Sequence, residues 1–285
     1  MNEMSFGPTR KRSGNAAKRR KLHNDPPVTT TTVSPRNSHQ HPPAIITAQQ
    51  LRRVVEKDEN SKQCQIIYLT NDEASWIMLI EKWWPCPDEV TFNEEWELHP
   101  PERHLLKIFG RIVSEKRWSQ SWGVSYAYSG STNAGRPISP DSRVAQLLQT
   151  VNDWVQQAAA GDFGMQRPYN ACLENWYEPD DTIGRHADDE RDMRKGLPIF
   201  SLSWGGTRRF VLRAKANTNQ KTEIFLQDGD LLVMGGTTQE THYHEIPKRR
   251  VTMDPPTSRR INWTVRAFHK KALDCNQPRP KTEAS

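Results

Sequence analysis

Two segments of the chain have the features of helices. The first begins at Thr70, where T-x-x-E with Glu73 forms a capping box. Apolar residues then recur at helical spacing, at Trp76, Leu79, Ile80 and Trp83. The pattern predicts a helix of about thirteen residues that ends at Pro85, because proline cannot continue a helix.

The second predicted helix begins near Ser139-Pro140, a favourable cap followed by proline at the first helical position. Its apolar stripe consists of Val144, Leu147, Leu148, Val151 and Val155. Gly161 is a natural end for it. Both stripes indicate core faces rather than binding grooves.

After Gly164 the chain changes to short segments rich in Val, Ile, Phe, Trp and Thr. Turn residues separate them, at Pro179-Asp180-Asp181, Gly205-Gly206, Asn217-Thr218-Asn219 and Asp228-Gly229. This texture predicts an antiparallel barrel or sandwich.

The first 44 residues carry almost no large apolar side chains, so we expect a disordered tail. Eight basic residues against Glu3 and Asp25 give this segment a charge of +6, which is the whole net charge of the chain. Its clusters Arg10-Lys11-Arg12 and Lys18-Arg19-Arg20-Lys21 are typical of a two-part nuclear import signal. The alternative is a solvated or phosphate-binding tail. Residues 271–285 are expected to form a second disordered tail.

The remaining composition favours a single folded domain of a soluble, intracellular protein. The mean hydropathy is −0.85, and no apolar stretch approaches the length of a membrane span. The four cysteines are scattered, without a metal-binding or disulfide spacing.

The first candidate for chemistry is His186-Ala187-Asp188. On a strand, residues two apart face the same side, so the imidazole and the carboxylate could bind one metal ion. Nine His and 34 acidic residues in 285 predict roughly one such spacing by chance. Alone, the pattern therefore favours a surface histidine beside a solvated aspartate.

A third metal ligand is available downstream. The apolar segment Leu231-Leu232-Val233-Met234 leads through two glycines to Thr241-His242-Tyr243-His244. Two histidines and one carboxylate on one face suit a non-haem Fe(II) oxygenase, although zinc hydrolysis uses the same ligands. His242 and His244 share strand parity, so either could be the third ligand.

The last predicted strand separates these two chemistries. Arg260, Asn262, Thr264 and Arg266 alternate with apolar residues, so one face carries two guanidiniums, an amide and a hydroxyl. Inside a barrel these two arginines would need anionic partners, and a dicarboxylate such as 2-oxoglutarate would supply one at each end. The alternative is an ordinary solvent-exposed face. Asn175 and Tyr177 show the same alternation and could complete a carboxylate site.

These motifs, in this order and spacing, closely resemble the AlkB family of oxidative nucleic-acid demethylases. The resemblance covers about Thr70 to Phe268 and includes the segment from Pro198 to Gly205. It implies a mainly β fold with flanking helices, a double-stranded β-helix (jelly roll). This dioxygenase domain would span residues 45–270, with a nucleotide-recognition lid at about 100–138.

The resemblance also implies a role for each motif residue. His186, Asp188 and His244 would bind Fe(II) as the catalytic centre. Arg266 and Asn175 would hold the end of 2-oxoglutarate that chelates iron, and the distal carboxylate would lie against Arg260, Asn262 and Tyr177, with Thr264 in the same wall. The cosubstrates would be 2-oxoglutarate and O2.

Within the family, the motifs are most similar to nuclear animal members that repair duplex DNA. Their V-F-G-K hairpin corresponds to Ile108-Phe109-Gly110-Arg111, which makes Phe109 a candidate wedge, or alternatively a packing aromatic. Tyr126 and Tyr128 match the lid motif Y-x-[YF]-S-G, and Tyr128 would stack on the target base. Asp189 and Glu190 match H-x-D-D-E and would meet its exocyclic amine, although Asp189 could also be a solvated turn residue.

These resemblances predict a monomeric, nuclear enzyme that demethylates 1-methyladenine- or 3-methylcytosine-type bases in duplex DNA and releases formaldehyde. Two departures leave the preferred strand open: Arg249 to Ser258 matches no homologue closely, and Ala187 replaces a basic residue. The alternatives are an RNA demethylase, a protein demethylase and a non-catalytic binding module.

Overall fold

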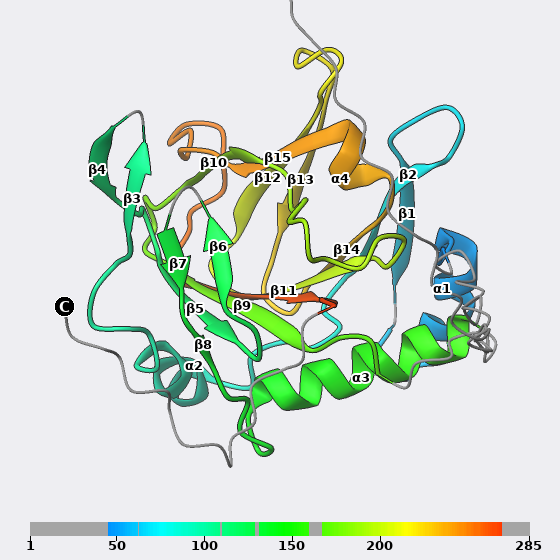
Figure 1. Cartoon of the computed structure of the whole chain (residues 1–285), viewed down its shortest axis with the longest axis horizontal. Coiled ribbons are helices and arrows are strands. Elements are labelled where there is room, and N and C mark those ends of the chain that lie inside the picture. The colour runs from blue at the N-terminus through cyan, green and yellow to red at the C-terminus, as the bar shows by residue number, and fades with distance from the viewer. Residues whose placement is uncertain (1–44, 62, 109, 129–130, 160–166, 270–285) are drawn as a thin grey trace, which may run out of the picture. The chain divides into compact units, whose positions relative to one another are not determined.

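An eight-stranded sheet forms the larger layer of the computed structural model, which describes residues 45–61, 63–108, 110–128, 131–159 and 167–269 (Figure 1). In spatial order its strands are β1 (Cys64–Tyr68), β2 (Ser75–Ile80), β14 (Leu231–Gly236), β11 (Ile199–Gly205), β16 (Arg260–Arg266), β9 (Ala171–Tyr177), β5 (Trp118–Trp122) and β8 (Gly135–Arg136). Neighbouring strands are antiparallel except β5 and β8.

A four-stranded antiparallel sheet packs against one face of the larger sheet. Its strands are β10 (Ile183–His186), β15 (His242–Ile246), β12 (Arg208–Ala214) and β13 (Lys221–Leu226). An apolar cluster between the sheets includes Ile77, Leu79 and Leu232 of the larger sheet and Leu212 and Leu226 of the smaller one. This pair of sheets confirms the predicted jelly roll, in which the space between the sheets is partly filled by core residues.

Helices cover the outer face of the larger sheet. Helix α3 (Arg143–Ala158) runs along this face in Figure 1, beside α1 (Ala48–Val55). Both helices are capped by side chains, because the hydroxyl oxygens of Thr47 and Ser142 accept hydrogen bonds from first-turn N–H groups. The other two helices in the described part of the chain are α2 (Glu89–Trp96) and α4 (Thr238–Thr241). The described residues contain no helix that is long and apolar enough to cross a membrane.

The helix predicted between Thr70 and Pro85 is wrong, because this segment forms the strand β2. All six residues of Ser75–Ile80 are buried between β1 and β14, so the run is apolar on both faces and its helical spacing is a coincidence. The Thr70 hydroxyl accepts a hydrogen bond from the N–H of Ser75 and closes the turn between β1 and β2. Glu73, with φ 57°, belongs to this turn and not to a capping box.

The second predicted helix is confirmed as α3, which begins three residues later than expected. Its cap is Ser142 instead of Ser139, and the predicted end at Gly161 lies outside the described residues. Within the predicted lid, β3 (Leu105–Ile108) pairs with β4 (Arg111–Ser114), and β6 (Tyr126–Tyr128) pairs with β7 (Ser131–Asn133). The basic tail with its import signal and the C-terminal tail also lie outside the described residues.

Candidate active site

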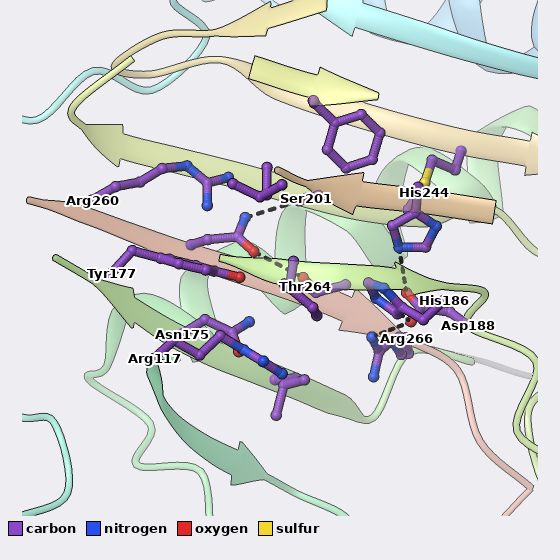
Figure 2. Close-up of a pocket in the computed structure, with 16 residues that line it drawn as sticks. Arg117, Asn175, Tyr177, His186, Asp188, Ser201, His244, Arg260, Thr264 and Arg266 are labelled. Atoms are coloured by element: carbon purple, nitrogen blue, oxygen red, sulfur yellow. Dashed lines mark hydrogen bonds and ion pairs between the residues drawn. The ribbon is translucent and has the colours of Figure 1, made fainter. Parts of the chain in front are cut away.

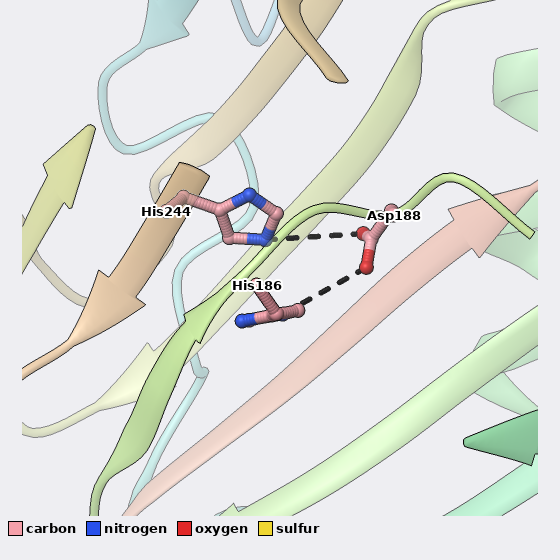
Figure 3. A group of neighbouring side chains, drawn as sticks. All are labelled: His186, Asp188 and His244. Atoms are coloured by element: carbon pink, nitrogen blue, oxygen red, sulfur yellow. Dashed lines mark ion pairs between the residues drawn. The ribbon is translucent and has the colours of Figure 1, made fainter. Parts of the chain in front are cut away.

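Three side chains form the only potential metal-binding group found among the described residues. His186 ends β10 and His244 lies directly opposite it on β15, so the centroids of the two imidazole rings are 4.2 Å apart. Asp188 follows β10 by two residues and turns its carboxylate toward both rings (Figure 3). Its oxygens lie 3.7 Å from His186 Nε2 and 4.0 Å from His244 Nε2.

The protonation states of these three side chains suit the binding of a divalent cation. Burial lowers the pKa of His244 to about 3 and also lowers the pKa of His186, so both imidazoles are neutral near pH 7. His186 Nδ1 lies 2.8 Å from the Gly184 carbonyl oxygen, which fixes the ring and leaves Nε2 as the ligand atom. Burial acts to raise the pKa of Asp188, but the Arg266 guanidinium, 2.8 Å away, together with His244 and His186 outweighs burial and lowers that pKa to about 2.

The geometry separates the two candidates for the third ligand. His244 is buried in the group described above, whereas His242 lies outside it. His242 Nδ1 is 2.8 Å from the hydroxyl of Thr241, and its backbone lies opposite Ala214 on β12. Strand parity alone could not distinguish the two histidines.

A cavity extends from this group between the two sheets (Figure 2). The polar face of β16 forms one wall, and Arg260, Asn262, Thr264 and Arg266 are each at most 7% exposed. The alternative of a solvent-exposed face is therefore wrong. Asn175 and Tyr177 of β9 lie beside β16 in register and line the same cavity. Apolar side chains complete the walls, from Leu173, Ile183, Phe210, Met234 and Ile246.

Arg260 is a buried cation of the cavity with few hydrogen-bond partners. Its Nη2 donates to the Ser203 hydroxyl at 2.9 Å, while Nε and Nη1 have no hydrogen-bond partner among the described residues. No carboxylate of that part of the chain forms an ion pair with it. Tyr177 is the neighbour that favours its charge, with a ring centroid 5.2 Å from Arg260 Cζ, while the nearby Arg208 adds positive charge. Burial lowers the pKa of Arg260 to about 10. A buried cation in this state calls for an anionic ligand.

Asn262 and Thr264 are tied into the wall itself. Asn262 Nδ2 donates to the Ser201 hydroxyl at 2.8 Å and to the Leu202 carbonyl at 2.7 Å, so both of its N–H groups bind β11. The Thr264 hydroxyl donates to Asn262 Oδ1 at 3.1 Å. Both side chains therefore shape the cavity through contacts within the protein.

Arg117 is a cavity residue that the sequence reasoning missed. Its Nε donates to Asn175 Oδ1 at 2.8 Å, and its Nη2 lies 3.5 Å from Glu115 Oε1. This hydrogen bond engages the oxygen of the Asn175 amide, which lines the same cavity. The alternation of polar residues at Glu115, Arg117, Ser119 and Ser121 is the signal in the sequence that could have indicated it.

The predicted substrate-binding residues are placed only in part. Phe109 lies outside the described residues, and for Tyr126 and Tyr128 only the pairing of β6 with β7 is described. The Asp189 side chain is 68% exposed and lies 3.9 Å from Lys215 Nζ. Asp189 and the partly buried Glu190 line a second hollow on the other side of Asp188.

Comparisons with known proteins identify the family of the chain. The family model described as "2OG-Fe(II) oxygenase superfamily" matches residues 101–266, more than half of the chain. The "DNA oxidative demethylase ALKBH2" of Mus musculus is 31% identical over 172 residues, which are 56% of this chain and 65% of the mouse protein. The "Alpha-ketoglutarate-dependent dioxygenase alkB homolog 3" of Homo sapiens is 29% identical over 155 residues, 51% of this chain and 49% of that protein.

A plant relative and one solved structure are also similar. The "DNA oxidative demethylase ALKBH2" of Arabidopsis thaliana is 27% identical over 218 residues, which are 67% of this chain and 65% of the plant protein. The solved structure of OsALKBH1 superposes with a TM-score of 0.47 at 20% identity, covering 72% of this chain and 100% of the other. The chain thus spans less than two thirds of the length of the curated relatives named here.

Proposed function

Because this chain belongs to the 2OG-Fe(II) oxygenase superfamily, we propose that it oxidatively demethylates N-alkylated bases of DNA at the site formed by His186, Asp188 and His244. One observation carries the proposal: a largely buried His-Asp-His group and a guanidinium without a carboxylate partner, Arg260, line the same cavity. A metal ion and a dicarboxylate would satisfy both. The substrate class is carried over from relatives named DNA oxidative demethylase.

Family membership confirms the prediction of a dioxygenase that uses Fe(II), 2-oxoglutarate and O2. The similarity to ALKBH2 and to alkB homolog 3 confirms the AlkB-type resemblance. The residues present fit these cofactors. Two neutral imidazoles and one ionised carboxylate on one face match an Fe(II) site, and Arg260 offers two buried N–H-bearing atoms to an anion.

In this proposal His186, Asp188 and His244 hold the metal, while Arg260 and Tyr177 hold the distal carboxylate of 2-oxoglutarate. Arg266 and Asn175 face its other end. Bound Fe(II) and 2-oxoglutarate supply the O2-dependent oxidation of an N-methyl carbon, after which the hydroxymethylated base releases formaldehyde.

The side chains of this protein provide position and a dry environment. Arg266 keeps Asp188 ionised, which a metal ligand requires. The Phe210 ring stacks on His244 with ring centroids 5.4 Å apart, so this contact restrains the orientation of the imidazole ring. The apolar walls exclude water, which strengthens every charge interaction inside the cavity.

We further propose that the enzyme acts as a monomer on duplex DNA in the nucleus. The basic clusters at residues 10–12 and 18–21 would serve import, and Phe109 would enter the gap left by a flipped base. Tyr126 and Tyr128 would then contact the base from the lid, and Asp189 and Glu190 would meet its exocyclic amine. Methylation of the pairing edge weakens pairing and so lowers the cost of flipping.

A substrate panel tests the proposal. The full chain, with Fe(II) and 2-oxoglutarate, is incubated with 1-methyladenine or 3-methylcytosine in duplex DNA, in single-stranded DNA and in single-stranded RNA. Mass spectrometry of the bases and assay of formaldehyde then report turnover. We expect loss of the methyl group, with duplex DNA as the preferred substrate.

Two alanine variants serve as matched controls. His244→Ala should abolish turnover, whereas His242→Ala should retain it, because only the first imidazole belongs to the metal-binding group. Preference for RNA would replace the DNA proposal with RNA demethylation. Intact methyl groups on every substrate, with no succinate formed, would refute the enzyme proposal altogether.

A further inference from the structure

Asp188 lies just beyond the end of β10, where strand pairing no longer provides backbone hydrogen bonds. The last pair of the β10–β15 ladder is His186 with His244, and residues 187–190 belong to no strand. The backbone N–H of Asp188 therefore needs a partner from elsewhere, because a buried N–H without one is costly. It donates to the side-chain oxygen Oε1 of Gln239 at 2.9 Å.

Both the side chain and the backbone of Gln239 form hydrogen bonds of their own. Its side-chain Nε2 donates to the sulfur of Met234 at 3.4 Å, which orients the amide with Oε1 toward Asp188. Its backbone carbonyl accepts a hydrogen bond from Lys215 Nζ at 2.9 Å. Gln239 lies beside Asp188 in the wall of the second hollow.

The helix that carries Gln239 is anchored to the larger sheet. The Ser75 hydroxyl lies 2.8 Å from that of Thr237 and 2.7 Å from that of Thr241. The Thr238 hydroxyl, which is buried, donates toward the backbone oxygen of Trp76 at 3.0 Å and accepts from the N–H of the same residue. Helix α4 is thus a fixed support of only one turn.

Helix α4 continues directly into β15, which carries His244. Gln239 therefore connects two segments that each supply a member of the metal-binding group, one through the Asp188 backbone and one through the chain leading to His244. We propose that Gln239 is a positioning residue, which sets the Asp188 carboxylate relative to His244 before metal binds. This inference rests on the proposed metal site, and Gln239 acts through Asp188 without contacting the ion.

Metal affinity is the direct readout of this role. Partners that orient a ligand typically change affinity by about 10- to 100-fold when removed. Gln239→Met keeps a side chain of similar volume but removes the acceptor, and Gln239→Glu keeps an acceptor oxygen. Gln239→Asn also removes the contact, because its amide is one methylene shorter. Gln65→Met, on the exposed edge of β1, is the matched control.

Binding of Mn²⁺ to the metal-free chain is titrated by the electron paramagnetic resonance of free Mn²⁺, which needs neither O2 nor turnover. We expect at least about tenfold weaker binding for Gln239→Met and Gln239→Asn. Gln239→Glu and Gln65→Met should bind within about threefold of the unaltered chain. Urea unfolding of each metal-free variant is measured in parallel.

Two results would overturn the inference. Unchanged Mn²⁺ affinity in folded Gln239→Met and Gln239→Asn would do so, even if their unfolding midpoints fell, because a purely structural role predicts that combination. Weak binding by Gln239→Glu as well would show that the acceptor oxygen is not what matters. Failure of the unaltered chain to bind Mn²⁺ is a separate outcome, which would refute the proposed metal site itself.

Discussion

Replacing Arg260 should separate the stability of this protein from its ability to bind 2-oxoglutarate. The pKa of Arg260 falls from 12.5 to about 10 on burial, and no carboxylate in the described part of the chain pairs with it. At about 1.4 kcal/mol for each pKa unit, the fall corresponds to about 3 kcal/mol of unfolding free energy. Since a lowered pKa means that the folded chain holds this cation less favourably, the cost applies at every pH below about 10.

Arg260→Met removes the charge and keeps most of the side-chain volume. The hydrogen bond to Ser203 is lost as well, and it contributes about 1 kcal/mol. We therefore expect the metal-free, ligand-free variant to be more stable than the unaltered chain by about 2 kcal/mol, measured by urea unfolding at pH 7. Arg259→Met is the matched control, because Arg259 is next to Arg260 in sequence but its side chain is 47% exposed and faces Glu178.

The same variant should lose its response to the ligand. In the unaltered chain, 2-oxoglutarate with Mn²⁺ should raise the unfolding free energy by about 2.7 kcal/mol at one hundred times its dissociation constant. Arg260→Met should show almost none of this increase, whereas Arg259→Met should keep it. If Arg260→Met were instead less stable without ligand, the cavity would already neutralise the guanidinium, and our reason for placing a dicarboxylate there would fail.

Three further predictions concern charged side chains other than Arg260. In urea unfolding, Glu174→Gln should be more stable than the unaltered chain at pH 8 and equally stable below pH 4.5. Burial raises the pKa of Glu174, so the unaltered fold loses stability as the pH rises above the ordinary pKa of a glutamate, 4.5. A stability difference that does not depend on pH would contradict this. Arg117→Met should weaken 2-oxoglutarate binding about tenfold in titrations with Mn²⁺ present, because the Asn175 amide loses its charged partner, and unchanged binding would count against this orienting role. Arg103→Leu should lower the unfolding free energy by about 3 kcal/mol, since its guanidinium binds both oxygens of the buried Asp181 at 2.9 and 2.7 Å, and an unaltered urea midpoint would show that the pair is dispensable.

The alternation of polar and apolar residues along the last strand predicted the polar wall of the cavity correctly. The alternation from Arg260 to Arg266 placed four polar side chains on one face, and the structure buries that face in the cavity. Helical spacing misled in Ser75–Ile80, because a strand buried on both faces has no alternation to set against a coincidental period of three or four.

Contacts between distant parts of the chain were beyond sequence reasoning. Arg117 meets Asn175 across 58 positions, and Gln239 meets Asp188 across 51. Neither side chain is unusual in its local sequence, and only the folded arrangement of the strands gives it a partner. The choice between His242 and His244 likewise depended on where β15 lies beside β10.

The direct pairing of His186 with His244 also limits how this protein can change through evolution. Side chains alternate along a strand, so a slip of one residue between β10 and β15 would send one imidazole to the opposite face. The irregular register between Ile183 and His186 already adjusts this alignment by a local bulge. Insertions or deletions in these two strands should therefore be lost from a lineage faster than equally destabilising changes in β13, because they remove the chemistry before they remove the fold.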